Sequence, residues 1–263
     1  MILQSGEVEY AGGGKGTQNT IINGNIDMKA GDDTLTLAKG TIINGNTGMG
    51  DNDDILTVEA ESIINGTLNG GMGRDTLNFD SPITRDAANG GINIYHNISG
   101  FENMNINTNV TLFEKTVGTT GNLENLTITG AENITIGANG VLTLRIDTSN
   151  INSSSGKDKI IGHALYKSTS SGTPSTLISS NGGKLLLALN GAGNSSIISF
   201  GETQLGNSLV TDYEGLSQEE VTFGTTSLLH SVKRVAGSNN EVEVTALNNL
   251  PLYSSTYGYE NLN

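Results

Sequence analysis

One phrase recurs in this chain at a fixed interval, and it constrains the fold more than any other feature. The sequence TIINGN occupies 20–25 and 41–46, and SIINGT occupies 62–67, so successive copies start at Thr20, Thr41 and Ser62, evenly spaced. A unit this short cannot bury its own apolar face, so similar units must stack on one another. The aligned columns are Ile21, Ile42 and Ile63; Ile22, Ile43 and Ile64; Asn23, Asn44 and Asn65; Gly24, Gly45 and Gly66; Asp33, Asp54 and Asp75; Leu35, Leu56 and Leu77; and Leu37, Val58 and Phe79.

Within each unit, apolar residues alternate with polar ones, as in Leu35-Thr36-Leu37 and Leu77-Asn78-Phe79. This period of 2 is typical of a strand with one buried face. The chain also contains 36 glycines, and Gly, Asn, Thr and Ser all disfavour long helices. We therefore predict an all-β fold, a right-handed parallel β-helix in which each strand pairs with its copies in the neighbouring coils.

The columns then acquire structural roles. We expect both isoleucines of the phrase to pack inward, the asparagine column to form a ladder of amide hydrogen bonds, and the following glycine to adopt a positive φ at a corner. At a constant period of about 21 residues, the 263-residue chain would make about 12 coils.

The pattern loosens after residue 80. FENMNI at 101–106 resembles LENLTI at 123–128, which would occupy the next coil in a slightly longer register. AENITI at 131–136 follows that phrase too soon for a full coil, so the last two phrases are interpreted as two faces of one coil. Longer inserts at 81–91 and 168–176 are predicted to leave the tube as loops.

These observations divide the chain into three parts. Regular coils are expected over 1–146, a less regular β-helix end and cap over 147–247, and a linker tail over 248–263. Within the second part, Val232–Val235 and Val242–Val244 predict a hairpin. A solenoid end exposes unpaired strands, so this hairpin-bearing region is expected to cap the tube.

Composition and charge exclude several classes of partner and chemistry. The formal charge of −14 argues against binding to nucleic acid or to anionic lipid, because both require clustered Lys and Arg. The absence of cysteine excludes disulfides and a thiol nucleophile. There is no apolar run long enough for a membrane span and no basic-then-apolar leader at the start, so we expect Met1 to be an artificial start in a piece of a longer protein.

A possible metal site lies in the segment 70–79, GGMGRDTLNF, which fits the calcium-binding nonapeptide G-G-x-G-x-D-x-U-x. Asp33, Asp54 and Asp75 would supply carboxylates from adjacent coils, with Asp32 and Asp53 beside them. Lys29 and Asn52 replace glycines of the motif in the earlier units, however, and the units recur at more than twice the spacing of true nonapeptide repeats. We favour the interpretation that each aspartate caps a turn by accepting backbone N–H bonds, and leave calcium open.

Catalytic chemistry has little support in the sequence. Sugar-cleaving enzymes such as the pectin-degrading lyases and the polygalacturonase-type hydrolases are built on β-helices, and the acidic column could imitate their paired carboxylates. Basic and aromatic residues that hold sugars are scarce, and His96, His163 and His230 lie far apart in the sequence. The segment 12–17, GGGKGT, lacks the phosphate-binding loop pattern and is expected to be a flexible lead-in. We expect no catalytic residues and no cofactor.

At the level of whole phrases, the chain resembles a known family. ISGFENMNI at 98–106 and NLENLTIT at 122–129 are similar to coils of the large autotransporter adhesins of fusobacteria. SVKRVAGSNNEVEVTALNNLP at 231–251 looks like the last passenger hairpin before the linker to the outer-membrane barrel. The chain thus resembles the C-terminal stalk region of the passenger of a type V autotransporter.

The resemblance implies a function and a location. Such a passenger passes through its own C-terminal outer-membrane barrel, which this chain does not include, and its C-terminal part folds first. It would be displayed on the bacterial cell surface at the outer membrane, or secreted, and would act in attachment to host cells or coaggregation with other bacteria. The implied partner is a surface receptor, protein or glycan, and the adhesive site could lie outside this chain. The alternatives are a β-helical polysaccharide lyase or hydrolase and a calcium-dependent secreted repeat domain.

Overall fold

The chain is represented by a computed structural model. It describes residues 2–3, 6–9, 15–81, 91–113, 115–117, 122–124, 126, 128–147, 158–159, 165–166, 177–190, 196–199, 221–225, 230–234, 236 and 241–246. Within these ranges the regular elements are β-strands, and no helix that could cross a membrane occurs there.

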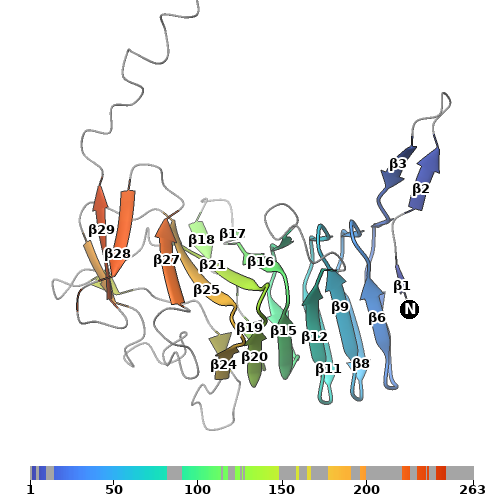
Figure 1. Cartoon of the computed structure of the whole chain (residues 1–263). Helices are drawn as coiled ribbons and strands as arrows, with labels where there is room; N and C mark the ends of the chain where they lie inside the picture. Colours follow the sequence, from blue (N-terminus) through green and yellow to red (C-terminus); the bar gives the residue numbers. More distant parts are fainter. Residues whose placement is uncertain are drawn as a thin grey trace, which may run out of the picture.

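Three parallel sheets form the sides of a tube (Figure 1). Sheet I consists of β1 (Ile2–Leu3), β6 (Thr34–Leu37), β9 (Ile55–Glu59), β12 (Thr76–Asp80), β15 (Asn103–Ile106), β20 (Asn133–Ile136) and β24 (Leu177–Ser180). Sheet II consists of β4 (Ile21–Ile22), β7 (Ile42–Ile43), β10 (Ile63–Ile64), β13 (Ile92–Ile94), β16 (Asn109–Leu112), β21 (Val141–Asp147), β25 (Lys184–Asn190) and β27 (Val221–Thr225). Sheet III consists of β5 (Ile26–Asp27), β8 (Thr47–Asp51), β11 (Leu68–Met72), β14 (Ile98–Ser99), β19 (Ile128–Thr129) and β23 (Leu165–Tyr166).

Successive strands pair in the register that the repeat in the sequence predicts. In sheet II, Ile42 pairs with Ile21 on one side and with Ile63 on the other. In sheet I, Leu56 lies between Leu35 and Leu77. The chain passes from sheet II to sheet III to sheet I in each coil and then starts the next. The prediction of an all-β parallel β-helix is confirmed.

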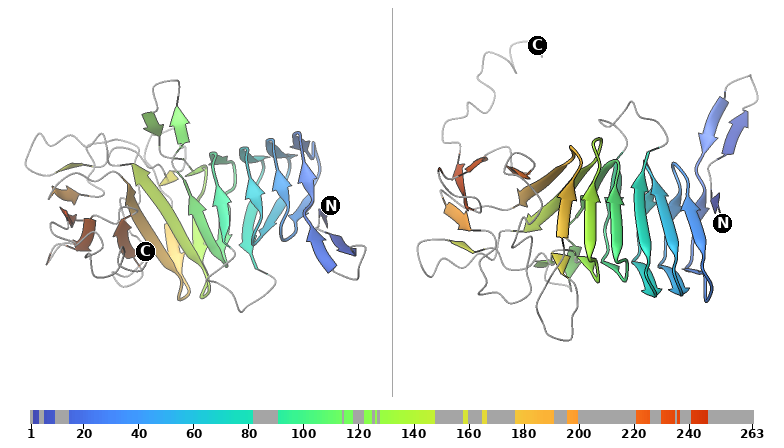
Figure 2. Two further views of the ribbon diagram at one scale, coloured as in Figure 1. Left: turned by 90° about the horizontal axis from the view of Figure 1, so that it is seen from above. Right: turned by 60° about the horizontal axis from the view of Figure 1, so that its bottom comes forward.

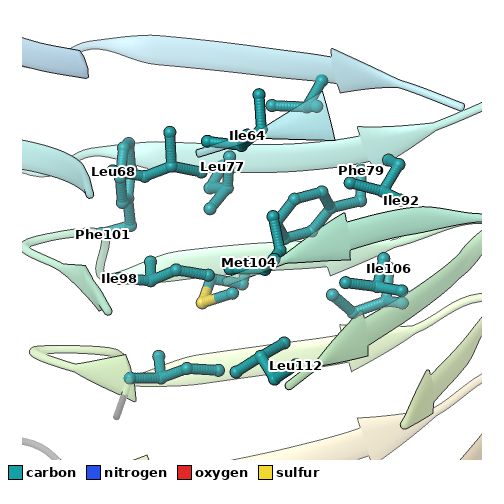
Figure 3. Packing of buried hydrophobic residues seen from close by; sticks show 14 of the residues in the cluster. Ile64, Leu68, Leu77, Phe79, Ile92, Ile98, Phe101, Met104, Ile106 and Leu112 are labelled. Carbon is teal, nitrogen blue, oxygen red and sulfur yellow. The ribbon is translucent and has the colours of Figure 1, made fainter. Parts of the chain in front are cut away.

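A single cluster of buried apolar side chains runs along the inside of the tube (Figure 3). Leu77 and Phe79 of β12 stack on Met104 and Ile106 of β15, their partners in the next coil. Burial of each such side chain contributes roughly 1.5–3 kcal/mol to folding. The interior columns of sheet I are Leu35, Leu56, Leu77, Met104 and Ile134, and Leu37, Val58, Phe79, Ile106 and Ile136.

The two isoleucines of the repeated phrase have different environments. Ile43 and Ile64 are fully buried, whereas Ile21 and Ile63 expose 55% and 37% of their surface. Adjacent residues of a strand point to opposite faces of the sheet, so only the second isoleucine can face the core. The prediction that both pack inward is therefore wrong for the first one.

The glycine after the ladder asparagine is needed for a close approach between coils. A Cβ on Gly45 would lie 2.2 Å from the carbonyl oxygen of Gly24, and one on Gly66 would lie 2.0 Å from that of Gly45. Of the three, only Gly24 has a positive φ, at 157°. The predicted positive φ is therefore wrong for Gly45 and Gly66, whose missing side chain lets the next backbone pass.

The coils after residue 80 contain more residues per coil than the earlier ones. Neighbouring strands of sheet I pair Thr76 with Asn103, Asn103 with Asn133 and Asn133 with Leu177. The described residues accordingly give sheets of seven, eight and six strands, fewer than the twelve or so coils that a constant period predicts. The inserts predicted as loops at 81–91 and 168–176 lie almost entirely outside the described residues.

The three later phrases stack differently from the prediction. FENMNI at 101–106 stacks on AENITI at 131–136, so that Met104 pairs with Ile134. Leu123 does not follow Phe101 in its column, because it lies in β18 (Asn122–Glu124), which pairs antiparallel with β17 (Lys115–Val117) in a hairpin. The predicted register between these two phrases is wrong. Ile128 of the same phrase pairs with Ile98 in sheet III, and β20 follows in sheet I, which confirms that the last two phrases occupy two faces of one coil.

Further elements lie at the two ends of the tube (Figure 2). At the N-terminal end, β2 (Gly6–Glu9) and β3 (Lys15–Gln18) form an antiparallel hairpin, so Lys15–Gln18 is a strand rather than a lead-in. At the other end, β22 (Asp158–Lys159), β26 (Ser196–Ser199), β29 (Glu241–Ala246) and β28 (His230–Arg234) form a separate sheet, called here the end sheet. β28 and β29 pair antiparallel, which confirms the predicted hairpin. The predicted tail at 248–263 lies outside the described residues.

Candidate functional site

The acidic residues singled out from the sequence gather at one corner of the tube. In the third unit, β11 of sheet III ends at Met72 and β12 of sheet I begins at Thr76, and Asp75 lies immediately before β12. Asp54 occupies the same place before β9, and Asp33 before β6. This edge, with Asp32, Asp33, Asp53, Asp54, Arg74, Asp75 and Glu102, is called here the acidic corner.

Carboxylates at the acidic corner link one coil to the next. The backbone N–H of Asp33 donates to Oδ1 of Asp54 at 2.7 Å, and that of Asp54 donates to Oδ1 of Asp75 at 2.8 Å. The ladder continues with Glu102, whose Oε2 accepts the N–H of Asp75 at 2.7 Å. The aspartates therefore cap backbone N–H groups, as the favoured interpretation predicted, but those groups belong to the preceding coil rather than to their own turn.

Two of these carboxylates are buried and only half satisfied. Asp54 and Asp75 expose 1% and 0% of their surface. Their Oδ1 atoms accept the ladder bonds, whereas Oδ2 of each is buried and has no hydrogen-bond partner among the described residues. A buried oxygen without a partner is costly for an ionised carboxylate, because solvent no longer stabilises its charge.

The electrostatics of the corner follow from this burial. Burial raises the pKa of Asp75 to about 6, and the nearby negative charges of Glu102, Asp54 and Asp53 add to the effect, while the N–H of Asp54 opposes it. Burial likewise raises the pKa of Asp54, with Asp33, Asp32 and Asp53 as the nearby charges. The cation of the corner, Arg74, is directed elsewhere: its Nη1 lies 3.2 Å from Oε2 of Glu132.

The backbone of the nonapeptide-like segment is preserved where its glycines are replaced. Lys29 adopts a φ of 79° where Gly71 of the third unit has 114°, and Asn52 adopts a φ of 84° where Gly73 of the third unit has 145°. A side chain at Gly71 would be 1.8 Å from the carbonyl oxygen of Gly50 in the preceding coil. Where the sequence departs from the motif, the side chain therefore changes and the positive φ of the turn is kept.

The acidic side chains of the described residues do not gather into a group of metal ligands. Among the residues that the structure describes, no three His, Cys, Asp or Glu side chains come together in a group that could hold a metal ion. The oxygens of Asp54 and Asp75 that face the ladder are already bonded to backbone N–H groups. The geometry thus fits coil-to-coil capping rather than metal ligation.

The histidines occupy separate elements where they are described. His96 is exposed just after β13, and His230 begins β28 in the end sheet, where it pairs with Ala246. His163 lies outside the described residues. The described part of the chain offers no histidine beside the acidic corner.

The amide ladder is confirmed, and it has a continuation that the sequence did not reveal. Asn44 donates to Asn23 at 2.7 Å and Asn65 donates to Asn44 at 2.9 Å. In the next two coils the same column holds Tyr95 and then Phe113, whose rings stack with centroids 4.8 Å apart. Arg145 lies over the Phe113 ring, also at 4.8 Å. The coils differ in length here, so a fixed interval in the sequence does not bring these three residues together. Only the pairing of the strands places them in the asparagine column.

One open hollow lies at the corner between sheets I and II. It has a volume of about 420 Å³ and is lined by Asn109, Ala138, Asn139, Gly140, Val141, Gly182 and Lys184. Sequence reasoning did not identify it, because its lining comes from turns of different coils. The described residues that line it place no carboxylate or histidine beside Lys184.

Comparisons with protein-family models, with curated proteins and with solved structures find no match to this chain.

Proposed function

We propose that this chain is a β-helical stalk segment of a bacterial surface adhesin of the autotransporter type. The observation that carries the proposal is the unbroken parallel pairing of three sheets along one tube, because such a fold is suited to holding a binding surface at a distance. The described ends of the chain, β1 and the end sheet, lie at opposite ends of the tube (Figure 1). In this role the chain acts mechanically rather than chemically.

Two further features support the proposal. Coils are joined through side chains as well as through backbone pairing, by the asparagine ladder and by the aspartate ladder. The β28–β29 hairpin of the end sheet follows β27, the last tube strand in the sequence, where a passenger of this type is expected to begin folding. We expect such a hairpin-bearing end to cover strand edges that would otherwise pair with other chains.

Surface display is tested on the organism that encodes the protein. Antibodies raised against the purified chain should label intact cells, and external protease should remove the label without lysis. Labelling that appears only after the cells are opened would contradict the proposal.

Adhesion is tested separately, by binding the purified, folded chain to partner bacteria, epithelial cells and a glycan panel. Saturable binding that a defined ligand displaces would place an adhesive site within these coils. Surface labelling without binding would assign the chain to the stalk and place recognition elsewhere in the protein.

A further inference from the structure

The ladder at the acidic corner has a feature that mechanical capping does not require. A carboxylate needs only one oxygen to accept the N–H of the preceding coil, and a neutral amide could do the same. Asp54 and Asp75 nevertheless place a second, titratable oxygen in the interior, where it has no hydrogen-bond partner among the described residues. The buried second oxygen therefore makes the protonation state of each carboxyl important for the ladder.

The surroundings of both groups favour a bound proton. The charged groups that face Asp54 are Asp32, Asp33 and Asp53, and those that face Asp75 are Asp53, Asp54 and Glu102; all of them are acidic. Gly70 of sheet III lies next to Asp75: a Cβ added to Gly70 would lie 2.7 Å from Oδ2 of Asp75. Glycine brings no charge, and Arg74 is paired with Glu132. Within the described part of the chain, neither oxygen is given a positive charge to balance an ionised state.

We propose that Asp54 and Asp75 form a proton-operated lock on the N-terminal coils, closed when Oδ2 of each carboxyl carries a proton and weakened when the proton leaves. The proton on Oδ2 removes the buried charge and leaves Oδ1 free to accept the ladder bond. Loss of the proton leaves two negative charges in adjacent coils, next to Glu102 and Asp53. The lock is a property of the fold and does not depend on the proposed adhesin role.

The direction of the pH effect follows from linkage. The pKa of Asp75 is about 6 in the folded chain, and an aspartate in an unfolded chain titrates near pH 4. Because the folded-state value is the higher one, the stabilisation is fully present at low pH and is lost as the pH rises through about 6. For Asp75 alone, the folded-to-unfolded equilibrium constant should be lower at pH 7 than at pH 5 by about tenfold.

Urea unfolding of the whole chain between pH 5 and pH 8 tests the lock. Wild type should lose stability as the pH rises, and Asp54→Asn/Asp75→Asn should have a much flatter profile, because asparagine keeps the accepting oxygen and cannot ionise. Asp51→Asn is the matched control: it removes an exposed carboxyl at the end of β8 that is not among the charges facing Asp54 or Asp75, and it should keep the wild-type slope. A wild-type profile that is flat or rises with pH, or a double variant with the wild-type slope, would overturn the proposal.

A second measurement keeps the proposal testable if the double variant does not fold. Carboxyl carbon shifts of Asp75 in wild type, followed by NMR against pH, should show an apparent midpoint near 6 for the coupled pair. A midpoint at or below that of an ordinary aspartate would refute the lock.

Discussion

Asn44 donates a hydrogen bond from Nδ2 to Oδ1 of Asn23, 2.7 Å away and 21 residues earlier in the chain. The same asparagine accepts the amide of Asn65 at 2.9 Å, so it is the middle rung of a ladder that crosses three coils. The spacing of the repeat in sequence thus becomes a spacing between coils, and a polar side chain helps to hold the stack together.

Truncation of this middle rung should have a moderate cost. Asn44→Ala removes both ladder bonds, but the amides are exposed and water replaces part of what is lost, so we expect a loss of about 1 kcal/mol in the free energy of unfolding. Urea unfolding measures it. Asn93→Ala is the control, because among the described residues Asn93 has no side-chain hydrogen bond. Equal effects of the two substitutions would show that the ladder contributes nothing to stability.

Glycine at the corner should be far less replaceable than glycine in the strand that follows. The added methyl of Gly45→Ala would lie 2.2 Å from the carbonyl oxygen of Gly24, so the coils would have to separate, and we expect a loss of several kcal/mol. Gly48→Ala meets nothing within 4 Å and should be neutral or slightly stabilising. Thermal unfolding of the two variants compares them, and equal tolerance would contradict the close approach of the coils.

Removing one buried hydroxyl group should raise the stability of the protein. Thr47 lies in the interior between Ile26 and Leu68, and its Oγ1 is buried without a hydrogen-bond partner among the described residues. Thr47→Val keeps the shape and removes the unsatisfied oxygen, so it should stabilise the chain by about 1 kcal/mol. Thr47→Ser keeps the hydroxyl, loses the methyl and should destabilise. A destabilised valine variant would mean that the hydroxyl has a partner.

Metal removal should leave the fold unchanged. The ladder oxygens of Asp54 and Asp75 accept backbone N–H groups, and the described residues assemble no group of three ligands. We therefore expect the same unfolding midpoint in calcium and in excess chelator. A fall in the midpoint with chelator, reversed by calcium, would restore the calcium-dependent repeat as the better hypothesis.

Sequence periodicity was enough to predict the tube, because a short, strictly spaced repeat with alternating apolar residues leaves few other ways to bury them. It did not reveal which isoleucine faces inward, since Ile21 and Ile22 are chemically identical and only the strand's position on the tube separates them. The pairing of Met104 with Ile134 was also missed, because a hairpin inserted between coils shifts similar phrases out of phase.

The candidate site was predictable in its residues and not in its contacts. The column of Asp33, Asp54 and Asp75 is visible in the sequence, and turn capping follows from the chemistry of aspartate. That each carboxylate reaches into the preceding coil, and that Glu102 continues the ladder after a longer coil, depends on how the corners stack. The period alone does not contain that information.

The most direct test of the β-helix is an aspartate scan along β9, followed by urea unfolding. Leu56 and Val58 are fully buried, whereas Ile55 is exposed at 43% and Thr57 faces outward between Thr36 and Asn78. Aspartate at Leu56 or Val58 would place an unpaired charge in the core, and we expect a loss of several kcal/mol or failure to fold. Aspartate at Ile55 or Thr57 should cost much less. The predicted result is a large loss of stability at Leu56 and Val58 and a much smaller loss at Ile55 and Thr57. Equal losses at all four positions, or the reverse order, would contradict the register and with it the fold.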